Sequence, residues 1–132
     1  MTQNINVKTG TRTELVDITA DVQQLVDESG TSSGICYLYV PHTTAGVTIN
    51  EGADPSVVKD ILNTLNSKIP HKANYMHMEG NSDAHIKSTI VGASATVIIE
   101  EGKLLLGTWQ SIFFCEFDGP RHRRISVKII EG

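Results

Sequence analysis

Three histidines stand where an imidazole could bind a ligand. His42 directly follows an apolar run and precedes the hydroxyl residues Thr43 and Thr44, and His77 and His85 lie in one polar segment. Imidazole nitrogens bind Zn²⁺ and similar ions, and catalytic zinc sites commonly use three protein ligands. We therefore expect His42, His77 and His85 to hold a divalent metal, with zinc as one candidate. The alternative is a polar loop with surface histidines, since the spacing matches no standard zinc motif.

A carboxylate and the only tryptophan add candidate contacts. Glu51 follows an expected strand and precedes a glycine, where it could act as a general base or hold a metal-bound water; a solvated glutamate is the alternative. Asp54 is better explained as a helix cap. Trp109 could stack on a flat heteroaromatic ligand while Gln110 hydrogen-bonds its edge, although core or subunit packing would explain the tryptophan equally well.

Three arginines gather at a turn near the end of the chain. A guanidinium group binds phosphate or carboxylate through two parallel hydrogen bonds, so Arg121 and Arg124 predict an anion site if the turn faces a pocket. If the turn is solvated instead, these arginines would pair with Glu116 or Asp118. The glycine-rich loops of nucleotide-hydrolysing motors and of dinucleotide enzymes are missing, which makes both classes improbable.

One small fold has to position these candidates. The chain has 132 residues, a length typical of one domain, and it contains no linker or repeat, so residues 1–132 are expected to share one core. Its content of 39% hydrophobic and 20% charged residues excludes a disordered chain. The net charge of −4 disfavours nonspecific binding to nucleic acid or to an anionic membrane. We therefore expect a small-molecule partner.

Sequence features also indicate the compartment. The first residues lack the basic-then-apolar order of a signal peptide, and no apolar run approaches the roughly 20 residues that span a bilayer. A cytoplasmic location is therefore expected. Cys36 and Cys115 lie inside apolar runs and form no C-x-x-C motif, which predicts two buried, reduced thiols.

Several short apolar segments are typical of strands. Alternation in residues 4–8 predicts a half-buried strand, and the continuous run 35–40 predicts a strand buried on both faces. Turn residues separate the segments in the last third of the chain, which indicates antiparallel sheet. Further strands are expected at residues 47–49, 95–99, 104–106, 111–117 and 125–130.

Helix signals occur at three places. One helix is expected between Thr19 and Gly30, and a second has Asp54 as its cap and proline at the first helical position. A third helix is expected to begin with Ser82 as its cap and to end at Gly92, with Ile86, Ile90 and Val91 on one side. Helices and strands that are partly segregated in this way predict an α+β fold with mixed, mostly antiparallel sheets.

Polar residues 70–83 separate the second and third expected helices. So long a connection is unusual in a compact domain unless it is functional or mobile. We therefore expect this segment to be the active loop.

Many of these candidates fall in four motifs that extend over nearly the whole chain. In this order and at these intervals, the motifs resemble those of the YjbQ-like family, whose members are often labelled secondary thiamine-phosphate synthases. The motifs are HTTAGV at 42–47 with NE at 50–51 and ADP at 53–55, EGN at 79–81 with DAH at 83–85, LGTWQ at 106–110, and Glu116 with DGPR at 118–121 and Arg124.

The resemblance implies a compact α+β domain that assembles as a homotrimer around histidine-lined pockets for metal or anions. It also implies a transferase activity that joins a hydroxymethylpyrimidine pyrophosphate to a thiazole phosphate. On this interpretation the catalytic residues are His42, Glu51, Asp83 and His85, and the substrate contacts are Thr43, Thr44, Asn81, Trp109, Gln110, Arg121 and Arg124.

Such a reaction requires neutralisation of the charge on the leaving pyrophosphate. Arg121 and Arg124 could supply it, with Glu51 or Asp83 orienting the metal ligands. We hypothesise that these residues meet in one cleft, and that apolar strands such as 112–117 suit a subunit interface. Two alternatives stay open: a metal-dependent hydrolase or transferase acting on another phosphorylated metabolite, and a noncatalytic module that binds a small anion or a metal.

Overall fold

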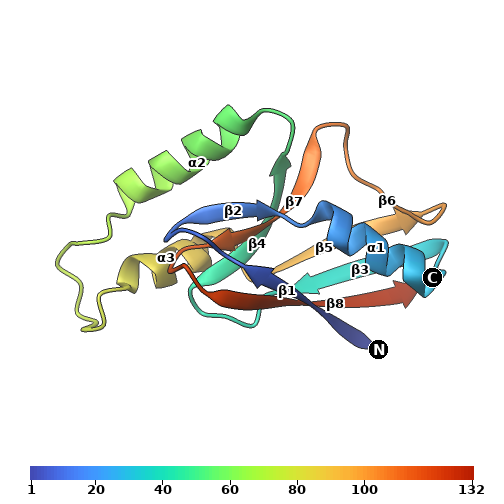
Figure 1. The fold of residues 1–132 in the computed structure, drawn as a ribbon, viewed down its shortest axis with the longest axis horizontal. Coiled ribbons are helices and arrows are strands. Elements are labelled where there is room, and N and C mark those ends of the chain that lie inside the picture. Colours follow the sequence, from blue (N-terminus) through green and yellow to red (C-terminus); the bar gives the residue numbers. More distant parts are fainter.

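The computed structural model describes residues 1–132 and contains two sheets and three helices (Figure 1). Both sheets are antiparallel throughout, so the expected α+β class is confirmed. In chain order the elements are β1 (Thr2–Lys8), β2 (Glu14–Asp17), α1 (Thr19–Ser29), β3 (Ser33–Tyr39), β4 (Ala45–Glu51), α2 (Pro55–Lys68), α3 (Ser82–Val91), β5 (Ser94–Glu100), β6 (Lys103–Leu104), β7 (Gln110–Glu116) and β8 (His122–Glu131).

The two sheets pack against each other around the main hydrophobic core. The larger sheet has the strand order β1-β8-β3-β5-β6 and the smaller has β2-β7-β4. Along β7, Ile112 and Phe114 point into the main core, whereas Phe113 and Cys115 point into a smaller cluster on the other face, beside α2 and α3. Because successive strand residues face opposite sides, β7 is buried on both faces.

The expectation that residues 35–40 form a strand buried on both faces is wrong. In β3, Cys36 and Leu38 lie in the core, but Ile35, Tyr37 and Tyr39 are 42%, 41% and 48% exposed. The second apolar layer belongs to β7 instead, because α2 and α3 cover the smaller sheet and leave the outer face of β3 open. The range 112–117 is therefore core, and not the exposed surface that a subunit interface requires.

Two helix boundaries follow the sequence signals closely. The Asp54 carboxylate accepts a hydrogen bond from the Ser56 N–H at 2.9 Å, and Pro55 begins α2, so the expected cap is confirmed. α1 ends at Gly30, whose positive φ of 69° is the left-handed conformation that glycine adopts at low cost.

The third helix differs from its expectation in two ways. Ser82 is its first helical residue and not its cap; Asn81 holds the N-cap position, and its side chain makes no capping hydrogen bond to the helix. Its buried residues are Asp83, Ala84 and Lys87, whereas Ile86 and Ile90 are exposed. The orientation of α3 is therefore set by a buried ion pair, which the apolar pattern did not reveal.

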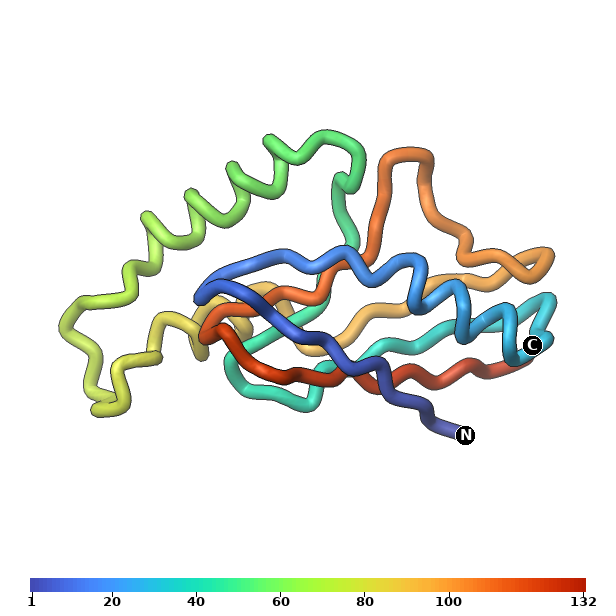
Figure 2. Tube along the Cα trace, in the orientation of Figure 1, coloured from blue at the N-terminus to red at the C-terminus, as the bar shows by residue number.

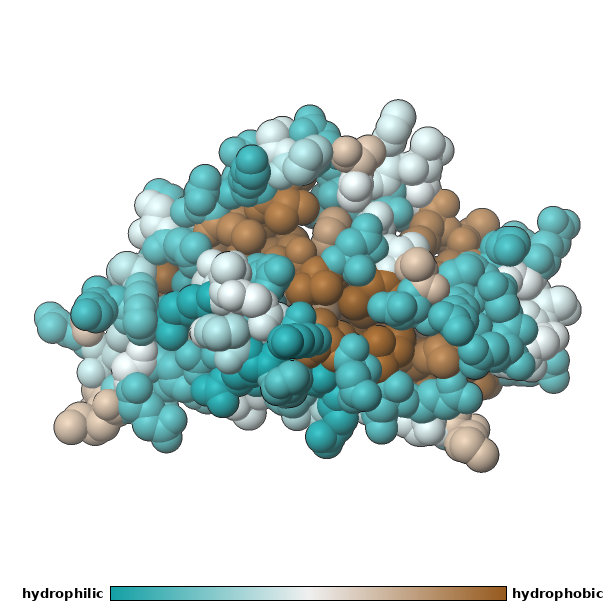
Figure 3. Space-filling model, in the orientation of Figure 1, coloured by the Kyte–Doolittle hydropathy of each residue, from teal (hydrophilic) through white to brown (hydrophobic).

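Two features lie outside the sequence expectations. β2 was not anticipated, although it pairs with β7 over four residues. None of the residues of α2 is fully buried, and apolar side chains gather below it in the middle of the face in Figure 3.

None of the three helices combines the length and the apolar character that crossing a membrane requires.

The tube in Figure 2 shows the connection between α2 and α3 at one end of the molecule. Residues 69–81, the connection between α2 and α3, lie at the end opposite to both chain termini. This connection forms neither helix nor strand, as expected for the segment between the second and third helices. It places His77 beside His85, which lies in the first turn of α3.

Candidate functional site

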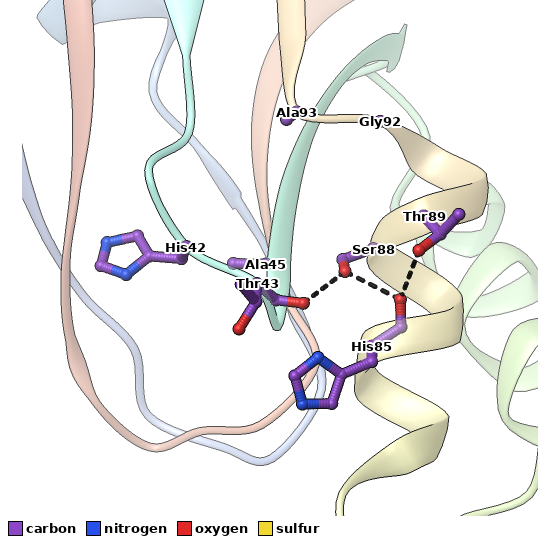
Figure 4. Close-up of a pocket in the computed structure, with 8 residues that line it drawn as sticks. All are labelled: His42, Thr43, Ala45, His85, Ser88, Thr89, Gly92 and Ala93. Atoms are coloured by element: carbon purple, nitrogen blue, oxygen red, sulfur yellow. Dashed lines mark hydrogen bonds between the residues drawn. The ribbon is translucent and has the colours of Figure 1, made fainter.

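One open polar pocket lies between the connection from β3 to β4 and the helix α3. We call it the His42 pocket, and its volume of about 450 Å³ is within the range of small-molecule sites. Figure 4 shows His85 projecting from α3 toward the loop that carries Thr43, with His42 on the other side of that loop. The lining residues are His42, Thr43, Ala45, His85, Ser88, Thr89, Gly92 and Ala93.

Close packing of α3 on β4 forms the floor of this pocket. The Ser88 hydroxyl donates to the Thr43 carbonyl at 2.7 Å, and the Val47 N–H donates to the Gly92 carbonyl at 3.1 Å. A Cβ at Gly46 would lie 2.6 Å from that same carbonyl, closer than atoms can approach. Only glycine at this position therefore allows the helix end to sit against the strand.

His42 is held as a neutral ring. The Arg124 N–H donates to His42 Nε2 at 3.1 Å, which places the lone pair on Nε2 and the proton of the neutral ring on Nδ1. Burial lowers the pKa of His42, and the positive charges of Arg123 and Arg124 lower that pKa further. His42 is therefore a hydrogen-bond donor through Nδ1, and binding a metal through Nε2 would break the contact with β8.

A buried ion pair between Arg123 and Glu116 lies next to the Arg124 backbone that contacts His42. Arg123 donates to both carboxylate oxygens of Glu116, and the Thr9 hydroxyl donates to the same carboxylate at 2.8 Å. Burial opposes ionisation of Glu116, but these hydrogen bonds outweigh it and hold the pKa of the carboxyl below its ordinary value. The Thr44 hydroxyl accepts from Arg123 at 2.8 Å, so Thr44 is buried in this network and does not face the pocket.

Asp83 lies in a second buried network. Its carboxylate accepts from Arg12 at 2.9 Å and from Lys87 at 3.2 Å, and it is completely buried. Lys87 also donates to Asn66 at 2.8 Å. Asp83 is therefore fully engaged within the fold and does not line the His42 pocket.

Two further predicted site residues are bound to Asp118. Arg121 donates to an Asp118 carboxylate oxygen at 3.0 Å, and the Asn81 amide donates to the same oxygen at 2.9 Å. Burial opposes ionisation of Asp118, but the hydrogen bonds from Asn81 and Arg121 and the charge of Arg12 leave its pKa below the ordinary value. Arg121 thus follows the alternative of pairing at the turn, whereas the side chain of Arg124 has no acidic partner.

The remaining predicted contacts lie at the far end of β4. Glu51 pairs in register with Gln110, and Glu51 and the pocket residue Ala45 are the two ends of the seven-residue strand β4, a span of about 20 Å. Trp109, 65% exposed, precedes Gln110. Glu51 accepts from the Ala53 N–H at 3.0 Å, and Gln110 accepts from the Gly107 N–H at 2.8 Å. Within one chain the predicted single cleft therefore does not form.

His77 and His85 do come together. Their ring centroids are 5.5 Å apart and nearly perpendicular, and Glu79 Oε1 lies 3.8 Å from His77 Nε2. A second pocket, of about 420 Å³, lies between this pair and residues 75–76; we call it the Met76 pocket. Its lining residues are Tyr75, Met76, His77, Ser82, His85 and Ile86.

The three predicted metal ligands do not converge within one chain. No group of three or more His, Cys, Asp or Glu side chains surrounds a common point. His85 lines both pockets, but His42 lines only the first and His77 only the second. The three imidazoles thus do not fit one shared ion in a single chain.

Sequence reasoning missed several residues that shape this region. Ser88 and Thr89 line the His42 pocket, and Arg12, Lys87 and Arg123 form the buried networks. Arg123 alternates with Arg124 along β8, so the period of a strand could have assigned one arginine to the core and one to the surface. No local signal marks Arg12, because its partners are distant in the sequence.

Comparisons with known proteins cover almost the whole chain. A family model described as UPF0047 protein YjbQ-like matches residues 3–132. A UPF0047 protein of Methanocaldococcus jannaschii is 61% identical over 124 residues, which are 94% of this chain and 90% of the relative. The UPF0047 protein YugU of Bacillus subtilis is 51% identical, with 98% of this chain and 99% of the relative covered.

Solved structures show the same fold. The crystal structure of an uncharacterized conserved protein of the yjbq/upf0047 family from Clostridium acetobutylicum matches with a TM-score of 0.95 at 53% identity. That match covers 97% of this chain and 99% of the other. A YbjQ-like protein from Sulfolobus solfataricus also matches with a TM-score of 0.95, at 38% identity. The arrangement of the two sheets is therefore common to these proteins.

Proposed function

This chain belongs to the UPF0047 family of YjbQ-like proteins, and we propose that it binds a phosphorylated small molecule in the His42 pocket. The observation that carries the proposal is the composition of the pocket. Two imidazoles and three hydroxyl side chains line it, no carboxylate does, and the positive charge of Arg124, which forms no ion pair, is near enough to lower the pKa of His42. Such surroundings favour an anion.

Hydrogen-bond donors for a phosphate group remain free at this site. His42 offers Nδ1–H, the Thr43 hydroxyl makes no other hydrogen bond in the fold, and the ring of His85 is likewise unengaged by hydrogen bonds. Arg124 supplies a delocalised positive charge that binds phosphate oxygens in pairs. These four groups would bind a pyrophosphate or phosphate ester without help from the buried arginines.

We infer from the family resemblance that the bound molecule is a pyrimidine pyrophosphate, which the protein joins to a thiazole phosphate. In that reaction the bond between the methylene carbon and the pyrophosphate oxygen breaks as the thiazole nitrogen attacks. Arg124 would stabilise the leaving pyrophosphate, and His42 would donate a hydrogen bond to it. Glu51, Trp109 and Gln110 receive no role in this chain's pocket, because Glu51 ends β4 at the strand end opposite Ala45, and Gln110, which Trp109 precedes, pairs with Glu51 there.

The divalent metal expected at His42, His77 and His85 has no role in these steps, because a single chain does not bring the three imidazoles to one point. The observation that favours the noncatalytic alternative is that the pocket contains no carboxylate to serve as a base. Binding of the phosphorylated ligand without turnover would support that module. Hydrolysis of another phosphate ester would support the hydrolase alternative.

Calorimetry with pyrophosphate tests the proposed site. Replacing Arg124 with Gln or His42 with Ala should weaken binding about tenfold each, because each removes a donor from the anion. Arg121→Gln is the matched control, since Arg121 is paired with Asp118, and it should change the affinity by less than about twofold. Equal effects of the two arginine substitutions would refute the assignment to this pocket.

The chemistry needs a separate assay. Purified protein is incubated with the pyrimidine pyrophosphate and the thiazole phosphate, with and without a chelator, and the product is followed by chromatography. Turnover that is lost in the Arg124→Gln variant would support the transferase. Tight binding of both substrates with no product would reject it in favour of the binding module.

We further propose that the chain forms a homotrimer through the outer face of the larger sheet. This face is uncovered, and apolar or aromatic side chains project from three of its strands, an arrangement that favours burial by another subunit. Sedimentation should give the mass of a trimer, and Tyr37→Lys should lower it; a stable wild-type monomer would contradict the proposal. The exposed side chains concerned are Ile35, Tyr37, Tyr39, Ile98 and Ile130.

A further inference from the structure

The Met76 pocket has a donor set that differs in kind from that of the His42 pocket. The thioether of Met76 and the imidazoles of His77 and His85 line one space of about 420 Å³. No Lys or Arg lines it, and the carboxylate of Glu79 lies 3.8 Å from His77 Nε2. The local charge therefore favours a cation, unlike that beside Arg124.

The separation of the two rings suits a shared ion. A metal bound to one imidazole nitrogen at about 2.0 Å lies roughly 3 Å from the centre of that ring, so two rings that share an ion have centroids up to about 6 Å apart. The rings of His77 and His85 are 5.5 Å apart. His71 Nε2 contacts the Gly80 carbonyl at 2.9 Å, and this contact joins the two ends of the loop that carries His77.

The third donor decides the class of metal. Thioether sulfur is a soft ligand that selects Cu(I) over Zn²⁺, whereas imidazole accepts either ion. Met76 is 96% exposed although it lines the pocket, and its unbranched side chain has three rotatable bonds, so it can turn toward the rings without moving the backbone. Tyr75 and Ile86 form apolar walls that would limit access of water to such an ion.

We propose that the Met76 pocket binds one Cu(I) ion through the sulfur of Met76 and the imidazoles of His77 and His85. The site goes beyond the phosphate site and uses a different third ligand from the predicted set of three histidines. The two cysteines do not compete for this ion as thiolates, because burial raises the pKa of Cys36 to about 11 and that of Cys115 to about 12.

The chain offers a matched control for the thioether. Met78 is 95% exposed and only two residues away, but it does not line the pocket. Leucine has nearly the shape of methionine and lacks the sulfur, and both positions are solvent-exposed, so neither substitution should unfold the protein. Met76→Leu and Met78→Leu therefore differ in one respect only, the access of the sulfur to the imidazole pair.

Competition for Cu(I) against a chromophoric chelator, with ascorbate and without oxygen, measures the affinity. Met76→Leu should weaken Cu(I) binding about tenfold and His77→Ala still more, whereas Met78→Leu should change it by less than about twofold. Zinc affinity, measured in parallel, should change less than about twofold in Met76→Leu. Equal losses in the two leucine variants, or an equal loss of zinc binding, would overturn the proposal.

A direct readout comes from protein labelled with ¹³C at the methionine methyl groups and titrated with Ag(I), a redox-inert soft ion. The Met76 resonance should shift and those of Met78 and Met1 should not. A shift of all three to the same extent would show unspecific binding and refute the site. Met76 and His77 do not line the His42 pocket, so pyrophosphate binding by these variants separates failure of this proposal from failure of the phosphate site.

Discussion

The two pockets on either side of His85 differ in the charge of the neighbouring groups and in the elements that hold those groups in place. On the His42 side, the backbone N–H of Arg124 donates to His42, the charges of Arg123 and Arg124 act on that ring, and the buried ion pair of Arg123 and Glu116 joins β8 to β7. The Met76 pocket adjoins a carboxylate, and one of its walls is the connection 69–81, which contains neither helix nor strand.

One imidazole therefore faces two environments of opposite sign. A histidine can donate to an anion or ligate a cation, and the groups beside it decide which. On the His42 side, strand ends fix the neighbours, and on the other side a loop supplies them. A firm frame suits recognition of a phosphate group by several fixed donors, whereas a movable thioether suits a soft ion that tolerates variable geometry.

Removal of the buried ion pair beside the His42 pocket should cause the largest loss of stability. In Arg123→Met the Glu116 carboxylate stays buried without its cation, which should lower the free energy of unfolding by about 3–5 kcal/mol in urea titrations. Tyr75→Phe, the control on the loop side, removes only the hydrogen bond to the Pro70 carbonyl and should cost about 1 kcal/mol or less. Similar losses of unfolding free energy in both variants would contradict the view that the His42 side is held more firmly than the loop side.

A smaller effect should follow from separating α3 from β4. The Cβ in Gly46→Ala would meet the Gly92 carbonyl, so the helix end must shift; we expect a loss of about 1–3 kcal/mol in unfolding free energy and weaker pyrophosphate binding. At Gly107 the nearest atom to a Cβ is the flexible end of Gln110, at 3.2 Å. Gly107→Ala should therefore be nearly neutral, and a comparable loss there would contradict this account of Gly46.

Removal of the shared imidazole should affect both ligands. We expect His85→Ala to weaken pyrophosphate and Cu(I) about tenfold each, which is about 1.4 kcal/mol per ligand. His42→Ala should weaken only pyrophosphate and His77→Ala only Cu(I), in parallel calorimetric and chelator titrations. If His85→Ala leaves either affinity unchanged, His85 belongs to one pocket and the comparison fails.

The smallest expected effect is a pH dependence on the His42 side. The folded pKa of His42 is below its ordinary value of 6.5, so the unfolded chain binds more protons as the pH falls through that value. The stability contributed by neutral His42 is present above about pH 6.5 and is lost progressively toward the lowered folded pKa. Unfolding titrations between about pH 7.5 and about pH 5.5 should therefore show a shallower decline in His42→Gln than in wild type; identical declines would contradict the buried neutral ring.

Element types and several boundaries could be predicted from the sequence, because their causes are local. The carboxylate and proline at the start of α2 and the glycine after α1 act within one helical turn, so the residues themselves reveal them. The pairing of His77 with His85 was also within reach, since one loop and the first turn of α3 carry both.

Burial of the strands could not be predicted in the same way. The run 35–40 and the strand β7 look alike in composition, yet only β7 has an apolar layer on each side. Likewise, Asp83 and Lys87 occupy the buried face of α3 because Arg12, distant in the sequence, supplies a counter-charge. The local pattern of residue types cannot reveal a partner that is distant in the sequence.

The sequence by itself determined the α+β class, the family motifs, the cap of α2, the glycine that ends α1 and the identity of the groups able to bind anions or metals. The tertiary structure alone decided that Arg124 has no acidic partner while Arg121 is paired, that Glu51 and Gln110 lie at the end of β4 opposite the His42 pocket, and that His85 lines two pockets. The physical reason is that local propensity acts over a few residues, whereas ion pairing and burial depend on which distant segments the two sheets bring together.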